Sequence, residues 1–379
     1  MAAAFALLAG CASDKSCCGS SASCCAITPV SVSHFGKANG KDIELYTLRN
    51  HKGAVATIST YAGTLVSLKV PDKSGELVDI ALGCDSVEGY LTNCPYLGAL
   101  IGRFGNRIGG ASFKLDGVEH KLAANNGPNN LHSGPNGFDK RIWTATSTRS
   151  KGGASVTMRY HSADGEEGFP GNLDVSVLFT LTEENELRVA FEAKTDRATV
   201  CNLTYHPYFN LSGAGTGDIL DHLLWVNAAK FTPVDSVQIP TGEIRAVAGT
   251  PLDFTMPSTI GARIDADHEQ IKFGAGYDHN WVINQTKPGE ITLQARATSP
   301  KTGITLEVLS SEPGVQFYSG NFLDGTVPGK SGQVYPRRSG FCLEPQHFPD
   351  SPNKPAFPST TLRPGQKYHN TIIYKFSAK

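Results

Sequence analysis

The sequence has no marked excess of charge of either sign. It contains 34 Lys and Arg side chains against 35 Asp and Glu, which gives a net charge of −1. A protein that binds nucleic acid through its phosphates needs a basic patch or stripe, so this balance argues against a nucleic-acid partner. Charged residues make up only 18% of the chain and apolar residues 40%, a composition typical of a compact globular protein.

The chain opens with an apolar run, residues 2–10, that is too short to cross a bilayer as a helix. A Ser- and Cys-rich stretch follows, and together they resemble an export signal, although no Lys or Arg precedes the run. The letters LAGC, ending at Cys11, resemble a bacterial lipobox, in which the cysteine carries a lipid. We therefore expect residues 1–27 to be a leader and linker, with Cys11 as the lipidation site and membrane tether. On this interpretation the protein is a lipoprotein of the bacterial cell envelope or periplasm; it is cytoplasmic if the leader is not a signal.

Motifs for several common chemistries are also missing. The segment GAGTG at 213–217 lacks the Lys-Ser/Thr of a phosphate-binding loop, and neither H-E-x-x-H nor G-x-S-x-G occurs. Five of the nine cysteines lie in the leader, without the C-x₂-C spacing and nearby His of a zinc site. We therefore expect no metal site. The remaining cysteines are interpreted as buried free thiols: Cys84, Cys94, Cys201 and Cys342.

Alternating apolar and polar residues are abundant, whereas helical periodicity is scarce. Residues 173–181 and 187–193 both alternate and are separated by a polar turn, which predicts an antiparallel hairpin. Asp116-Gly117 lies between two short alternating runs and is a favoured hairpin turn. Forty glycines and 22 prolines indicate many turns. No change of composition marks a second linker after the leader. We therefore expect one all-β domain over residues 28–379, a large antiparallel β-sandwich.

Polar residues recur inside aromatic segments that are bracketed by glycine or proline. These segments are GRFGNRIGG, NNGPNNLHSG, CNLTYHPYFNLSG, GYDHNWVIN, EPGVQFYSGNF and GFCLEPQHFPD. Each has a plain structural alternative: His206 as a hydrogen-bonded core residue, Arg107 in a salt bridge, Asp278 as a turn cap. Glu344 lies in an apolar run and needs a partner or a use, because burying an unpaired carboxylate is costly. Taken together, aromatic rings with polar side chains between them are what a sugar site needs.

The six segments, in this order, resemble the aldose 1-epimerase family, and the resemblance runs from about residue 30 to the end of the chain. It implies a large β-sandwich and interconversion of the α and β anomers of free aldoses such as glucose and galactose. It also implies Glu344 as the general base and His206 as the general acid. The other positions that the resemblance assigns to the substrate are Asn106, Arg107, His132, Tyr208, Asp278 and Gln316.

This reaction opens the sugar ring to the aldehyde and closes it on the other face, so it needs an acid and a base but no redox partner, and we expect no cofactor. Three alternatives stay open. A glycoside hydrolase would use Asp278 and Glu344 as its carboxylate pair. A carbohydrate-binding protein would hold sugar without catalysis. An epimerase of hexose phosphates would need a basic cluster, for which Arg337-Arg338 is the only adjacent arginine pair. We expect a small aldose as the partner, and a monomer or weak dimer.

Overall fold

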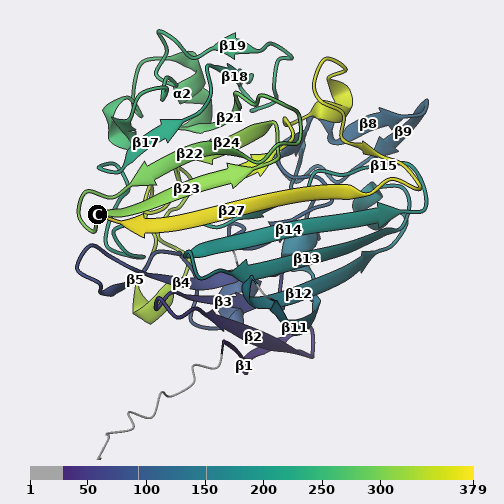
Figure 1. Ribbon diagram of the computed structural model, residues 1–379. Coiled ribbons are helices and arrows are strands. Elements are labelled where there is room, and N and C mark those ends of the chain that lie inside the picture. The colour runs from purple at the N-terminus through teal and green to yellow at the C-terminus, as the bar shows by residue number, and fades with distance from the viewer. Residues whose placement is uncertain (1–28, 93, 151) are drawn as a thin grey trace, which may run out of the picture.

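The computed structural model describes residues 29–92, 94–150 and 152–379, so the predicted leader and Cys11 lie outside the described residues. The largest element is a nine-stranded sheet (Figure 1). Its strands, in spatial order, are β11 (Thr144–Ser150), β12 (Gly153–Ser162), β13 (Leu173–Leu181), β14 (Glu186–Thr195), β27 (Tyr368–Ala378), β23 (Ile304–Ser310), β22 (Thr292–Thr298), β17 (Leu223–Val226) and β20 (Ser258–Thr259). The last strand in the sequence, β27, therefore lies in the middle of the sheet, between β14 and β23.

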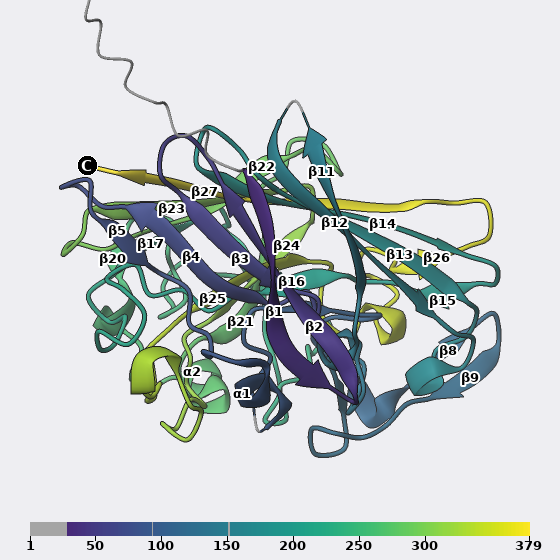
Figure 2. The ribbon, with the colours of Figure 1, turned by 90° about the horizontal axis from the view of Figure 1, so that it is seen from below.

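Two five-stranded sheets accompany the large one. The first contains β1 (Val30–Ala38), β2 (Lys41–Arg49), β3 (Val55–Ser59), β4 (Leu65–Pro71) and β5 (Leu77–Asp79) in chain order. The second has the order β19 (Arg245–Ala246), β18 (Lys230–Thr232), β21 (Asp278–Val282), β24 (Gly314–Tyr318) and β25 (Cys342–Gln346). In Figure 2, which views the molecule from below, β2, β3 and β4 run diagonally across the middle, and β27 of the large sheet lies above them in the picture.

Short pairs and helices complete the fold. The two-stranded pairs are β6 (Ala99–Ile101) with β16 (Thr204–His206), β7 (Arg107–Ile108) with β10 (Asn130–Leu131), β8 (Ser112–Leu115) with β9 (Val118–Lys121), and β15 (Thr199–Val200) with β26 (Thr361–Leu362). The α-helices are α1 (Val87–Leu91) and α2 (Glu269–Gly274), and 3₁₀ turns occur at Gly109–Ala111, Phe138–Lys140, Glu166–Gly168, Ile260–Ala262, Lys330–Gly332 and Ser351–Asn353. Among the described residues, no helix has the length and apolar character needed to cross a membrane.

The predicted all-β antiparallel fold is confirmed. The hairpin forms as β13 and β14, with Leu181 opposite Leu187, and all pairings between the named strands in these three sheets are antiparallel. Asp116 and Gly117 connect β8 to β9 with φ values of 50° and 83°. Positive φ at both central residues is what a two-residue type I′ turn requires.

One continuous apolar core joins the three sheets. Leu48 of β2 and Val177 of β13 belong to it, as do Trp281, Phe317 and Leu343 from β21, β24 and β25. Because side chains alternate along a strand, these last three leave the opposite face of the second five-stranded sheet for other residues. That opposite face carries the functional site.

Candidate active site

The strand β25 presents Glu344 on the face that points away from the core. It is the last strand of its sheet, and an edge is where a proline such as Pro345 is tolerated, because its missing N–H costs no ladder bond. Leu343 packs into the core and is fully buried, while Glu344 lines a cavity on the other side. The apolar neighbours of Glu344 thus hold the strand, and the carboxylate faces the cavity.

All eight residues that the sequence placed at a sugar site line this one cavity, which has a volume of about 300 Å³. They come from separate elements: β7 and the turn before it, the loop after β10, β16 and the loop after it, β21, β24 and β25. Sequence reasoning did not single out a further group of lining residues: Pro95, Tyr96, Asn126, Leu131, Gln238, Tyr318 and Phe322. Four of them lie in the glycine- or proline-bracketed aromatic segments, namely Asn126, Leu131, Tyr318 and Phe322, whereas Tyr96 and Gln238 lie in loops without such a pattern.

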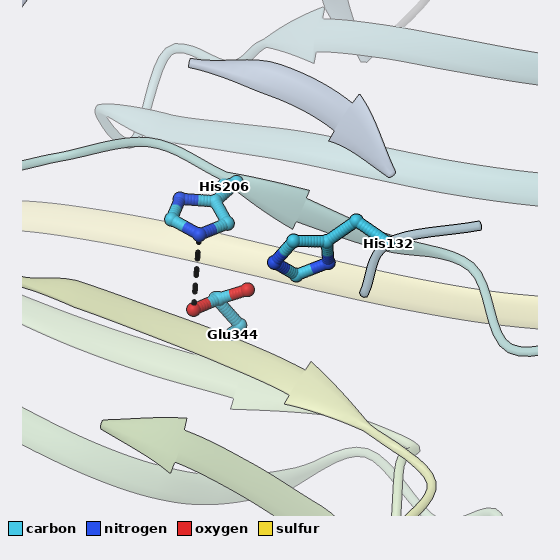
Figure 3. A group of neighbouring side chains, drawn as sticks. All are labelled: His132, His206 and Glu344. Atoms are coloured by element: carbon cyan, nitrogen blue, oxygen red, sulfur yellow. Dashed lines mark ion pairs between the residues drawn. The ribbon is translucent and has the colours of Figure 1, made fainter. Parts of the chain in front are cut away.

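Glu344 and His206 lie next to each other in the lining of the cavity. The Nε2 atom of His206 lies 3.6 Å from Oε1 of Glu344 (Figure 3), and the two residues are 4% and 2% exposed. This separation exceeds that of a hydrogen bond, so neither group is tied up by the other and each can pair with a substrate atom instead. Oε2 of Glu344 is buried without a hydrogen-bond partner among the described residues. An unused carboxylate oxygen in a sugar-sized cavity is suited to accept a hydroxyl proton.

Burial shifts the two pKa values in opposite directions. Desolvation, reinforced by Asp278 and opposed by Arg107, raises the pKa of Glu344 well above its ordinary value. Desolvation lowers the pKa of His206 to about 4, against smaller opposing effects of its own backbone carbonyl and of Asp278. Burial therefore favours the neutral form of both groups, and the pair retains one proton over a wide pH range.

His132 lies beside this pair, with its ring 5.3 Å from that of His206 and edge-on to it. Its Nδ1 accepts a hydrogen bond of 3.1 Å from the backbone N–H of Asn106. Since Nδ1 is an acceptor, the proton of the neutral ring is assigned to Nε2. Burial, with contributions from His206 and Arg107, holds the pKa of His132 well below its usual value. His132 is thus a neutral hydrogen-bond donor.

The same tautomer bears on metal binding. His132, His206 and Glu344 each offer a ligand atom, and these atoms lie within 4.8 Å of one another. Two histidines and a carboxylate can bind zinc, but a ligating nitrogen must offer its lone pair. In His132 the proton on Nε2 blocks metal binding through that nitrogen. Moving the proton to Nδ1 would place the Nδ1–H against the backbone N–H of Asn106. The arrangement favours proton transfer over metal binding.

A fixed polar network lines the cavity next to this pair. Arg107 approaches Asp278 at 3.6 Å and donates from Nε to Asn126 at 2.9 Å and from Nη2 to Gln238. Gln316 donates to Asp278 at 2.7 Å. Arg107 therefore forms the salt bridge that was the structural alternative, and it also lines the cavity. Donors and acceptors held in this way can read the hydroxyl pattern of a sugar ring.

Tyr208 and Asn106 contribute in ways that sequence could not specify. The Tyr208 ring stacks on His206 with centroids 5.0 Å apart, and its hydroxyl donates to the Pro95 carbonyl at 2.9 Å. Tyr208 is thus a wall of the site with an engaged hydroxyl. The side-chain oxygen of Asn106 accepts from the backbone N–H of Arg107 at 2.9 Å, which fixes the turn before β7.

Two features of the structure bear on the alternative functions. Arg338 forms a bidentate ion pair with Asp265, Arg337 donates to the Ala275 carbonyl, and neither lines the cavity. They do not supply a phosphate site there. Asp278 is held by Arg107 and Gln316, so it is poorly placed to act as a second free carboxyl group of a glycosidase.

Comparison with known proteins agrees with this site. The family model for aldose 1-epimerase matches residues 44–375. The chain is 46% identical to galactose mutarotase from Bos taurus over 335 residues, which is 88% of this chain and 94% of the relative. It is 44% identical to galactose mutarotase from Homo sapiens and 37% identical to aldose 1-epimerase from Escherichia coli, each over 90% of this chain and 97% of the relative.

These relatives contradict one prediction. The leader suggested a bacterial envelope or periplasmic lipoprotein, but the mammalian relatives share 42 to 46% of residues with this chain and the Escherichia coli protein 37%. The bacterial envelope location is therefore wrong. The physical reason is that the signal was weak: a short apolar run before a cysteine, without the basic start of an export signal, arises easily in an Ala- and Leu-rich segment.

Solved structures extend the agreement to the fold. A galactose 1-epimerase from Lactobacillus acidophilus superposes with a TM-score of 0.81 at 28% identity, over 92% of this chain and 98% of that one. An aldose epimerase homologue from C. elegans gives 0.80 at 31% identity, over 88% and 98%. With the family model, the relatives and the fold in agreement, this chain belongs to the aldose 1-epimerase family.

Proposed function

We propose that residues 28–379 interconvert the α and β anomers of free aldohexoses, such as glucose and galactose, with Glu344 as the base and His206 as the acid. The observation that carries this proposal is the buried pair in the cavity lining, 3.6 Å apart and with one carboxylate oxygen unengaged. The fixed network around Arg107 and Asp278 supports a sugar as the ligand, because it offers several donors and acceptors within one small cavity.

Ring opening transfers one proton to Glu344 and one proton from His206, and ring closure reverses both transfers. In the resting form both groups are neutral; moving the Glu344 proton to His206 gives the reacting form, in which Glu344 is a carboxylate and His206 an imidazolium. Glu344 takes the proton of the C1 hydroxyl, the bond between C1 and the ring oxygen breaks, and His206 gives its Nε2 proton to that oxygen. The products are the open aldehyde, a neutral carboxyl group and a neutral imidazole. Burial stabilises the two neutral groups, so it favours ring opening.

Rotation about the C1–C2 bond then exposes the other face of the aldehyde. The former ring oxygen attacks C1, His206 takes back its proton, and Glu344 returns a proton to the new C1 hydroxyl. His132 donates from Nε2 throughout and stays neutral, so it can hold a sugar oxygen without competing for the transferred proton.

The test is exchange between the anomers of glucose and of galactose, followed by polarimetry or by NMR magnetisation transfer. The wild type should accelerate exchange over buffer, Glu344→Gln should nearly abolish the acceleration, and His206→Asn should reduce it by at least about 10²-fold. Wild-type exchange in Glu344→Gln would refute the assigned roles.

Two companion assays separate the alternative functions. A glycosidase would release free sugar from an aryl glycoside, and a binding protein would bind sugar with no change in anomer exchange. A hexose-phosphate epimerase would prefer glucose 6-phosphate to glucose. We do not expect this preference, because Arg338 is paired with Asp265 and is not free to bind a phosphate.

A further inference from the structure

The two histidines of the site differ in what faces their Nδ1 atoms. In His132 it is the backbone N–H of Asn106, at 3.1 Å, which can only donate. In His206 it is the sulfur of Cys342, at 3.5 Å. The partner of one ring nitrogen decides where the proton of a neutral imidazole resides. The two histidines therefore favour different tautomers.

Side chains of strand β25 lie next to both ring nitrogens of His206. Cys342 and Glu344 are two residues apart on this strand, so their side chains leave the same face, about 6.6–6.8 Å apart along it. Cys342 approaches Nδ1 and Glu344 approaches Nε2. One short strand thus holds the imidazole between a thiol and a carboxyl group.

We propose that Cys342 is a positioning residue for His206: its sulfur accepts the Nδ1–H and keeps Nε2 as the nitrogen that exchanges a proton with the sugar. His132 holds the opposite tautomer and remains a donor. This inference rests on the proposed function, because it assigns the proton transfer to His206.

Three features favour the Nδ1–H tautomer of His206. Nε2 faces the Glu344 carboxyl group, whose neutral form carries a proton, and a lone pair on Nε2 suits that neighbour better than an N–H would. The backbone carbonyl of His206 acts on the ring as an acceptor and raises its pKa, against the larger lowering by burial. The chemistry also requires it, because an acid that gives and regains a proton at Nε2 must keep the other proton on Nδ1.

A thiol is an unusual partner here, and its neutrality matters. Cys342 is fully buried, and burial, with Glu344 and Asp278 adding, raises the pKa of its thiol, so the sulfur carries no charge. A carboxylate at this place would stabilise the imidazolium and raise the pKa of His206. A neutral, weakly accepting sulfur orients the ring and leaves the low pKa of His206 intact.

The test combines ¹⁵N NMR of the histidine rings with steady-state anomer exchange in the full chain. In the wild type, His206 should show a proton on Nδ1 and His132 on Nε2. Cys342→Ala should shift His206 towards the Nε2–H tautomer and lower kcat about two- to tenfold, the effect of one neutral hydrogen bond. KM should stay unchanged, because Cys342 does not line the cavity.

Two further variants make the test specific. Cys342→Ser supplies an oxygen acceptor and should recover the tautomer and most of kcat. Cys201→Ala removes another buried thiol, 2% exposed and outside the cavity, and should change neither. The proposal is overturned if His206 of the wild type carries its proton on Nε2, if Cys342→Ala keeps the wild-type tautomer, or if the Ala and Ser variants lose kcat equally. Failure of the proposed function would appear separately, as a wild type that does not accelerate exchange.

Discussion

Replacing Glu344 by glutamine should separate catalysis from folding. Glutamine has nearly the shape of the neutral carboxyl group that burial favours at this position, so the fold should tolerate it. It cannot take the proton of the C1 hydroxyl. Removal of one general base typically costs about 10²- to 10⁴-fold in rate, which corresponds to about 2.7–5.4 kcal/mol of transition-state stabilisation. We expect kcat for anomer exchange, measured by NMR magnetisation transfer, to decrease by a factor within this range.

The same variant should become relatively more stable as the pH rises. In the unfolded wild type, Glu344 ionises near its ordinary pKa of 4.5, whereas its pKa in the folded protein is raised by burial. The stability that comes from keeping this proton is complete below pH 4.5 and is lost as the pH rises through the folded pKa. In that window the free energy of unfolding of the wild type falls by about 1.4 kcal/mol for each pH unit. Glutamine has no proton to lose, so its advantage over the wild type should grow.

Denaturant unfolding of both proteins from about pH 4.5 to about pH 6.5 would measure this difference. The control is Glu312→Gln, another carboxylate that is 2% exposed but whose partner is His347, outside the cavity. It should lose about 1–3 kcal/mol of stability and keep its kcat. A Glu344→Gln variant with kcat within tenfold of the wild type would refute the role of the base. A stability difference that does not change with pH would refute the raised pKa.

Three further outcomes follow from the site. The pH profile of kcat should be broad, with an acid limb near the His206 pKa of about 4 and an alkaline limb displaced upward with the pKa of Glu344; a single limb near pH 6.5 would contradict this. Asp278→Asn should raise KM for galactose about tenfold by loosening Arg107, and should move the alkaline limb to lower pH because Asp278 raises the pKa of Glu344. Arg337→Ala should leave exchange unchanged in the same assay, since this side chain does not line the cavity; a large loss would contradict the boundary drawn for the site.

Local patterns were sufficient to predict much of the fold. Alternation over residues 173–193 predicted the central hairpin, since one face of each strand had to be apolar to pack. Glu344 was singled out for a physical reason as well, because a carboxylate in an apolar run must be paired or used. Sequence could not predict what depends on register between distant segments. The contact of Cys342 with His206 joins residues 136 positions apart, and it requires β16 to lie beside β25.

Loop geometry was the second limit. Tyr96 and Gln238 reach the cavity from backbone with φ of 60° and 64°, a left-handed conformation that neither residue type favours. Tertiary contacts impose it: the Gln238 side chain donates to the Phe273 carbonyl at 3.1 Å, and the Tyr96 ring packs 4.5 Å from that of His132. No local sequence pattern predicts either contact.

The central position of β27 has a consequence for how this protein is made. The ribosome synthesises β27 after every other described strand, yet the sheet needs it to join β14 to β23. Until then the facing edges of β14 and β23 remain unpaired, and exposed strand edges invite pairing with other chains. The nascent polypeptide cannot complete its largest sheet as it emerges. A chain that terminates shortly before Tyr368 should therefore be a substrate for chaperones and proteases rather than a weakened enzyme.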